Sequence, residues 1–296
     1  MMKKYLFYFL LVPSLFLNTN AAEILSAYSN ICSPGPIRIS GEIQKGDSIK
    51  LSNIITKRKT QYQELGCNKR SFLNYDLRTN FFLNTTGGDV DESIKIGYII
   101  RQNESSVFVS RNAQCFSSCV FILAGGVFRG TDGMVGIHRP YFQDLKGNLS
   151  TSEIKQIRDV SIRSMKNYFN EMDVSEALVD AMLSIEPSKI KILTHSELEF
   201  FRLQGTDANY DEKITAQSAQ KYNLSSSEYR KRETISDAKC KKSEDSRDHI
   251  CHYMILLDIT SQEYESRAAR LYNCFGKEAD QKKMESCVFK TIVLNQ

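Results

Sequence analysis

Short apolar runs alternate with amphipathic stretches over residues 37–193, and this alternation constrains the fold more than any other feature. The runs have the length and the β-branched or aromatic content of buried strands. They cover residues 37–43, 81–83, 107–109, 134–137 and 190–193. Helical patterns occupy residues 47–56, 90–101, 117–125 and 150–183 between them. Strands alternating with helices indicate an α/β core with parallel strands.

Groups that acyl-transfer chemistry requires stand at the ends of these runs. Gly87 and Gly88 form a turn after one run, and His138 directly follows another. Ser117 and Ser118 open the apolar stretch that reads as a buried helix. A serine nucleophile needs an adjacent base, and the developing oxyanion needs backbone N–H donors. Because sites in parallel sheets lie at the carboxyl ends of strands, these groups predict a hydrolytic site.

Each of these features also has a purely structural interpretation. The Gly87-Gly88 pair suits any tight turn before a helix. Ser117 and Ser118 suit a helix N-cap, and His138 suits a hydrogen-bonded histidine at a strand end. The functional interpretation therefore depends on their occurring together.

The first residues have the composition of a targeting signal. Lys3 and Lys4 precede an apolar stretch at residues 5–16, and small residues lead up to Ala22. The apolar stretch is short for a membrane span, so residues 1–22 predict a signal peptide cleaved after Ala22. An uncleaved anchor is the alternative. No later stretch is long and apolar enough to cross a bilayer, so we expect no span in the mature chain.

The cysteine content suggests disulfides formed in an oxidising compartment. An even number of cysteines behind a signal peptide favours such bridges. The eight are Cys32, Cys67, Cys115, Cys119, Cys240, Cys251, Cys274 and Cys287. No Cys-x-x-Cys pair is present, and only His249 and His252 lie close to a cysteine, so we expect no metal site.

The pairing of these cysteines is only partly constrained. A bridge between Cys115 and Cys119 would rigidify the turn that carries Ser117, although Cys119 as a buried thiol is the alternative. Cys32 and Cys67 would then pair by elimination. The last four cysteines allow three pairings. Cys240 and Cys251 are eleven residues apart and would share a face of one helix.

The length of 296 residues suggests more than one domain. The chain becomes polar, charged and helical after about Asp211, which predicts a core at residues 23–212 and a small disulfide-stapled helical domain at residues 213–296.

The polar residues 57–70 read as a solvated insertion. Without Lys3 and Lys4, 37 Lys and Arg remain against 35 Asp and Glu, a formal charge of +2. The charge therefore gives no case for nucleic-acid binding.

Taken in order, five segments resemble the Clp-protease-like branch of the crotonase superfamily, in its secreted bacterial form. They are ISGEI at residues 39–43, LNTTGGDV at 83–90, CFSSC at 115–119, GIHRP at 136–140 and LTHSEL at 193–198. The resemblance covers roughly residues 35 to 210. It implies a crotonase-like core of spiral β-β-α units.

The resemblance also implies roles for individual residues. Ser117 would be the nucleophile, with Ser118 as its competitor, and His138 the base. The amides of Gly88, or its neighbour Gly87, and of Ser118 would form the oxyanion hole. The implied protein is a periplasmic serine peptidase without a cofactor, acting on a peptide or protein substrate and assembling as a homo-oligomer.

The segment before residue 193 departs from the family pattern. Active relatives carry an aspartate there, whereas this chain has PSKIK at residues 187–191. Glu186 is the nearest acid and Asp180 is farther. The site is therefore a Ser–His dyad, a triad completed by Glu186, or inactive.

Two other functions follow from these observations. A non-catalytic binding protein on the same fold fits the missing acid, with the cysteine-rich C-terminal domain as its protein-contact module. Acyl-coenzyme A chemistry would use the same oxyanion geometry, but an exported chain meets little coenzyme A.

Overall fold

The computed structural model describes residues 21–27, 35–65, 79–141, 150–240, 246–270 and 290–291. The strands are β1 (Glu23–Ser26), β2 (Ile37–Ile43), β3 (Asn80–Gly88), β4 (Ser106–Val109), β5 (Gln114–Phe116), β6 (Phe128–Thr131), β7 (Met134–Ile137), β8 (Lys191–Ile192) and β9 (Gly205–Thr206). The helices are α1 (Asp47–Glu64), α2 (Val90–Gln102), α3 (Cys119–Ala124), α4 (Thr151–Glu171), α5 (Ala177–Ser184), α6 (His195–Phe200), α7 (Ala208–Lys221), α8 (Ser226–Lys239), α9 (Ser246–Leu257) and α10 (Ser261–Arg270).

The strands form one mixed sheet that forks at β3. Five pairings are parallel: β2 with β3, β3 with β4 and with β5, β4 with β6, and β5 with β7. Strands β1, β8 and β9 add antiparallel edges. The first part of β3 pairs with β4, whereas Thr85 pairs with Cys115 of β5. The expected α/β core with parallel strands is confirmed, and the crotonase-like spiral stays a prediction.

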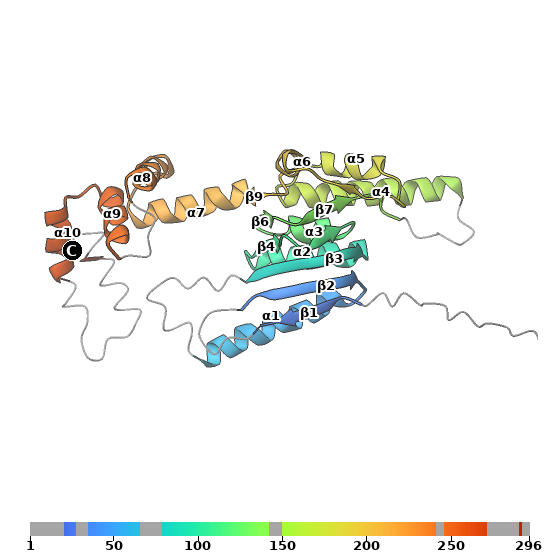
Figure 1. The fold of residues 1–296 in the computed structure, drawn as a ribbon, viewed down its shortest axis with the longest axis horizontal. Coiled ribbons are helices and arrows are strands. Elements are labelled where there is room, and N and C mark those ends of the chain that lie inside the picture. Colours follow the sequence, from blue (N-terminus) through green and yellow to red (C-terminus); the bar gives the residue numbers. More distant parts are fainter. Residues whose placement is uncertain are drawn as a thin grey trace, which may run out of the picture.

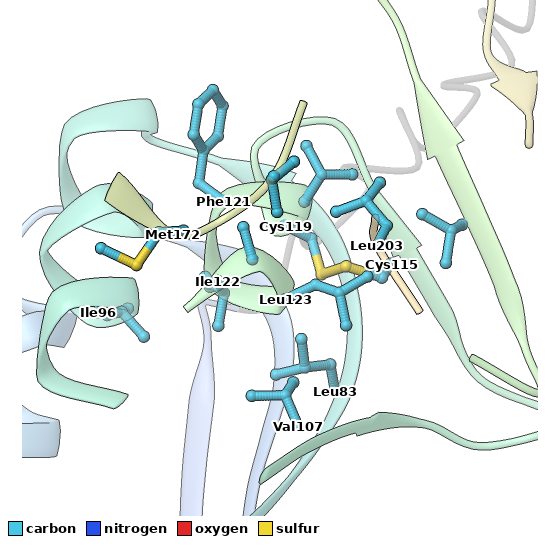
Figure 2. Close-up of a cluster of buried hydrophobic side chains, with 14 of the residues drawn as sticks. Leu83, Ile96, Val107, Cys115, Cys119, Phe121, Ile122, Leu123, Met172 and Leu203 are labelled. Atoms are coloured by element: carbon cyan, nitrogen blue, oxygen red, sulfur yellow. A yellow bond between two sulfur atoms is a disulfide. The ribbon is translucent and has the colours of Figure 1, made fainter. Parts of the chain in front are cut away.

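The buried core lies between the sheet and its helices. Helix α3 is fully buried, and its Ile122 and Leu123 belong to the same cluster as Leu83 and Val107 of the sheet (Figure 2). Such a helix needs an apolar surface all round, as the sequence of residues 119–124 provides. Helix α3 therefore fixes the turn that precedes it.

Two sequence expectations about the first half of the chain are wrong. Helix α1 continues to Glu64, so residues 57–64 are not a solvated insertion. Arg58 is buried there because its guanidinium donates to the carbonyl oxygens of Gly35 and Ala27. Strand β3 also runs through the expected turn and ends only at Gly88, where β2 still pairs with it.

A buried ion cluster joins the sheet to the helices that follow it. Arg129 of β6 is 1 % exposed and donates to the carbonyl oxygens of Ala124, Met172 and Arg202. Its guanidinium lies 3.6 Å from Asp207, the N-cap of α7. Burial and the neighbouring Arg101 lower the pKa of Arg129 to about 10, so the group stays charged at neutral pH.

Helices α7 to α10 extend away from the α/β part (Figure 1). A disulfide joins Cys240, at the end of α8, to Cys251 in α9. The two cysteines therefore lie on different helices, and the expectation of one shared helix face is wrong. The boundary near residue 212 stays a prediction.

Several expectations fall outside the described residues: the signal peptide up to residue 20, and the bridges of Cys32, Cys67, Cys274 and Cys287. Within the described ranges, no helix combines the length and the hydropathy that a bilayer span requires.

Candidate active site

Ser117 occupies a left-handed turn between β5 and α3. Its φ is +55°, which is uncommon for a residue other than glycine. Its N–H donates to the carbonyl oxygen of Gly136 in β7 at 2.9 Å, and the residue is half-buried. A serine held in a strained strand-to-helix turn is the geometry that presents a nucleophile in α/β hydrolases.

Ser118, the competing nucleophile, lies in a different environment. It is buried, and its Oγ is hydrogen-bonded to Ser93 Oγ of α2 at 3.0 Å. The Ser93 hydroxyl also lies 2.8 Å from the carbonyl oxygen of Asp89. The Ser118 side chain therefore connects the turn to α2 through a hydrogen bond. Ser117 is the more accessible of the two serines.

Gly87 packs directly against the serine turn. A Cβ on Gly87 would lie 2.6 Å from Phe116 O, 2.7 Å from Ser117 Cβ and 2.9 Å from Ser118 N. Gly87 and Gly88 both have positive φ, +94° and +140°. The Gly87 N–H donates to Thr85 Oγ1 at 3.1 Å, and Gly88 pairs with Ile43 of β2, so the oxyanion role of their amides stays a prediction. These positions require glycine because a side chain would meet backbone atoms.

His138 follows β7 and is 8 % exposed. Its Nδ1 lies 2.8 Å from the carbonyl oxygen of Arg139. A carbonyl oxygen only accepts, so this contact places the proton on Nδ1 and leaves Nε2 unprotonated in the neutral ring. The ring also packs edge-on against Tyr141, with centroids 5.7 Å apart, and the Tyr141 hydroxyl donates to Pro187 O.

Ser117 and His138 both follow the carboxyl ends of strands, at the same end of the sheet. Strands β5 and β7 are parallel neighbours, with Phe116 opposite Gly136, so both residues follow at the carboxyl ends. Among the hydrogen bonds of the described residues, none joins Ser117 to His138.

Glu186 lies on the segment that runs beside His138. The N–H of Arg139 donates to Ile185 O at 3.1 Å, which brings this segment to the site. The Glu186 carboxylate is exposed and pairs with Lys189 at 2.9 Å. The other nearby acid, Asp180, pairs with Lys166 of α4. Glu186 as a third catalytic residue stays a prediction.

A disulfide brackets the serine turn. Cys115 of β5 and Cys119 of α3 are bridged, with Cα atoms 5.2 Å apart, and both are fully buried in the core (Figure 2). The bridge spans the residues on either side of Ser117. The expected pairing of these two cysteines is confirmed.

We expect replacement of both Cys115 and Cys119 by serine to cost about 2 kcal/mol of unfolding free energy, the chain-entropy value for such a short loop. Labelling of the serine by a fluorophosphonate should slow as well, because the turn gains freedom. Urea unfolding and labelling rates measure the two effects. The Cys240→Ser/Cys251→Ser variant is the matched control and should keep the wild-type labelling rate.

Glu92 links the first turns of two helices near the glycines, a role that the sequence did not indicate. Its carboxylate accepts from Ser48 N of α1 at 3.0 Å and pairs with Lys95 at 2.8 Å. Burial alone would raise the pKa of Glu92, but the bonds from Lys95 and Ser48 outweigh it and lower the pKa to about 2. The carboxylate thus stabilises the fold when it is charged.

The pKa of Glu92 predicts a loss of stability in acid. The folded pKa lies below the ordinary 4.5, so the contribution is complete above pH 4.5 and disappears as the pH falls toward 2. The shift corresponds to about 3 kcal/mol. Urea unfolding at several pH values should show a smaller acid-induced loss for Glu92→Gln than for wild type. Identical pH dependence in the two proteins would contradict this role.

His195, in the LTHSEL segment, is exposed on α6 and pairs with Glu199. Within the described ranges, no three His, Cys, Asp or Glu side chains gather as a metal site would require.

Comparison with known proteins gives a distant similarity. No family model and no curated protein matches the chain. Among solved structures, it is similar to a membrane-bound stomatin-specific protease, solved as a serine-to-alanine mutant, with 18 % sequence identity and a TM-score of 0.40. The match covers 60 % of this chain and 82 % of that one. We therefore infer the function from the geometry of the chain's own residues.

Proposed function

We propose that the chain is a secreted serine-type hydrolase, acting on peptide or protein substrates in the periplasm. The observation that carries the proposal is the left-handed turn of Ser117, packed against Gly87 and hydrogen-bonded to the strand that leads to His138. If Gly87-Gly88 and Ser117-Ser118 were only structural turns, they would not need to lie together near the end of the strand that leads to His138. Their proximity would supply a hydroxyl, backbone donors and an imidazole at the carboxyl ends of the strands.

The chemistry follows from these positions. Ser117 Oγ attacks the substrate carbonyl carbon while its proton passes to His138 Nε2. The amides of Gly88 and Ser118 stabilise the oxyanion. The carbon–nitrogen bond then breaks, the amine leaves with the proton from His138, and an acyl-serine remains. Water, deprotonated by the same imidazole, hydrolyses it.

We assign the orientation of the imidazole to a backbone carbonyl. Arg139 O holds the tautomer in which Nε2 is the base. A neutral carbonyl stabilises the imidazolium less than a carboxylate does, so we expect a slow Ser–His enzyme. Completion of a triad by Glu186 would require its carboxylate to leave Lys189.

A non-catalytic binding protein is the second candidate. The absence of a Ser117–His138 hydrogen bond within the described residues, and the pairing of Glu186 with Lys189, favour it. The C-terminal helices would then provide the contact with a protein partner.

Labelling rates with a fluorophosphonate test the first candidate. Wild type should label, Ser117→Ala should not, and His138→Ala should label at least about 100-fold more slowly because it lacks the base. His195→Ala is the matched histidine control and should keep the wild-type rate. Folded wild-type protein that does not label would favour the binding protein.

A further inference from the structure

Helices α2 and α4 enclose a cavity that contains none of the candidate catalytic or oxyanion residues. Its volume is about 420 Å³, which lies within the usual range for small-molecule sites. Side chains of both helices line it, among them Ile94, Tyr98, Arg163, Asn167, Tyr168 and Glu171. The cavity is therefore a candidate binding site separate from the serine turn.

The buried floor of the cavity is preformed. Tyr168 is 2 % exposed, and its hydroxyl donates to Phe121 O of α3 at 2.6 Å. Its ring packs edge-on against the ring of Tyr98, with centroids 5.1 Å apart. Gly97 allows this packing, because a Cβ at that position would lie 1.8 Å from the Tyr168 hydroxyl oxygen. A site whose walls are already fixed needs little ordering when a ligand binds.

Three exposed polar side chains of α4 follow one another along the cavity. Arg163, Asn167 and Glu171 are spaced at intervals of four residues, so they share one face of the helix. A rise of 1.5 Å per residue separates the first from the third by about 12 Å along the axis. We call these three side chains the polar row. It presents a cation, an amide and a carboxylate in that order.

The two charges of the polar row have no counter-ion nearby. Among the residues that the structure describes, no carboxylate pairs with Arg163 and no cation pairs with Glu171. Glu171 Oε2 accepts a hydrogen bond from the Tyr98 hydroxyl at 2.7 Å, which orients the carboxylate. Lys166 of the same helix, in contrast, pairs with Asp180. Two opposite charges at the ends of one cavity complement a ligand that carries both charges.

We propose that this cavity binds a short peptide whose two termini are free. The terminal carboxylate pairs with Arg163, a peptide group hydrogen-bonds to the Asn167 amide, and the terminal ammonium pairs with Glu171. An extended chain covers about 3.5 Å per residue, so about three or four residues span the polar row. Ile94 and the Tyr98 ring contact the side chains of the peptide. Because the cavity contains no reacting group, the inference does not depend on the proposed function.

Binding of trialanine, measured by isothermal titration calorimetry, tests the proposal. The mature oxidised protein carries Ser117→Ala, so that the peptide stays intact. We expect trialanine to bind about fivefold more tightly than N-acetyl-trialanine or trialanine amide, because each of these lacks one ion pair with an exposed partner. Arg163→Gln should bind trialanine and its amide equally. Glu171→Gln should bind trialanine and its N-acetyl form equally.

Arg111→Gln and Glu199→Gln are the matched controls, because both residues are exposed and lie outside the cavity. Both should keep the wild-type preference for free termini. Absence of binding, or equal affinity for the three peptides, would overturn the proposal. Binding whose preferences survive both Arg163→Gln and Glu171→Gln would also overturn it and would place the peptide elsewhere. None of these outcomes changes the labelling of Ser117, so the proposed function fails or stands separately.

Discussion

Gly87→Ala should abolish most of the reactivity of Ser117 while the fold survives. The added Cβ would lie 2.6 Å from Phe116 O and 2.9 Å from Ser118 N, both backbone atoms that cannot rotate away. The serine turn and the oxyanion amides must therefore shift. Loss of one oxyanion donor alone slows acyl transfer by about 100- to 1000-fold. Fluorophosphonate labelling rates, with far-ultraviolet circular dichroism to check folding, measure the effect.

Gly205→Ala is the matched control for this prediction. Gly205 has a φ of +87°, close to the +94° of Gly87, but a Cβ added to Gly205 would have no neighbouring atom within 4 Å. Both variants bear the backbone strain, and only Gly87→Ala adds the clash at Ser117. Equal labelling rates in the two variants would show that Gly87 does not support the reactive turn.

Arg129→Met should cause the largest loss of stability. The change leaves the carbonyl oxygens of Ala124, Met172 and Arg202 without their buried donor, and it removes a cation from beside Asp207. Breaking a buried ionic cluster by removing one partner costs about 3–5 kcal/mol. Urea unfolding monitored by tyrosine fluorescence measures the change in unfolding free energy.

The exposed Arg230 provides the comparison for Arg129. Arg230 pairs with Asp211 and Glu212 between α7 and α8 and is 43 % exposed. Arg230→Met should lower the unfolding free energy far less than Arg129→Met does, because water replaces the lost contacts. An unfolding free energy equally lowered by both substitutions would contradict the structural role of the buried cluster.

The sequence predicted those parts of the fold that depend on local pattern. The alternation at residues 37–43 and the short apolar run at residues 134–137 marked β2 and β7 with their observed bounds. Strand β5 was missed because its 3 residues are too few to show a periodicity. The extent of α1 was missed because Arg58 is buried through long-range bonds to backbone carbonyls, which a hydropathy pattern cannot report.

The sequence predicted the candidate site in the same way: it gave the positions that depend on local pattern, and it did not give the contacts that depend on the path of the chain. Gly87 and His138 stood at predicted strand ends and Ser117 at a predicted helix start, and parallel pairing brings the ends of β3, β5 and β7 together. The contact of His138 with Arg139 O depends on the path of the chain after β7. The close approach of Ile190 and Phe116 to the backbone of Gly136 depends on sheet register. Neither leaves a local signal in the sequence.

The residue that a fluorophosphonate modifies decides whether Ser117 is a nucleophile. The oxidised mature protein is labelled, its intact mass is measured, and the modified residue is located by peptide mass spectrometry. We predict one adduct per chain, on Ser117. An adduct on Ser118, or none on folded protein, would contradict the assignment of Ser117.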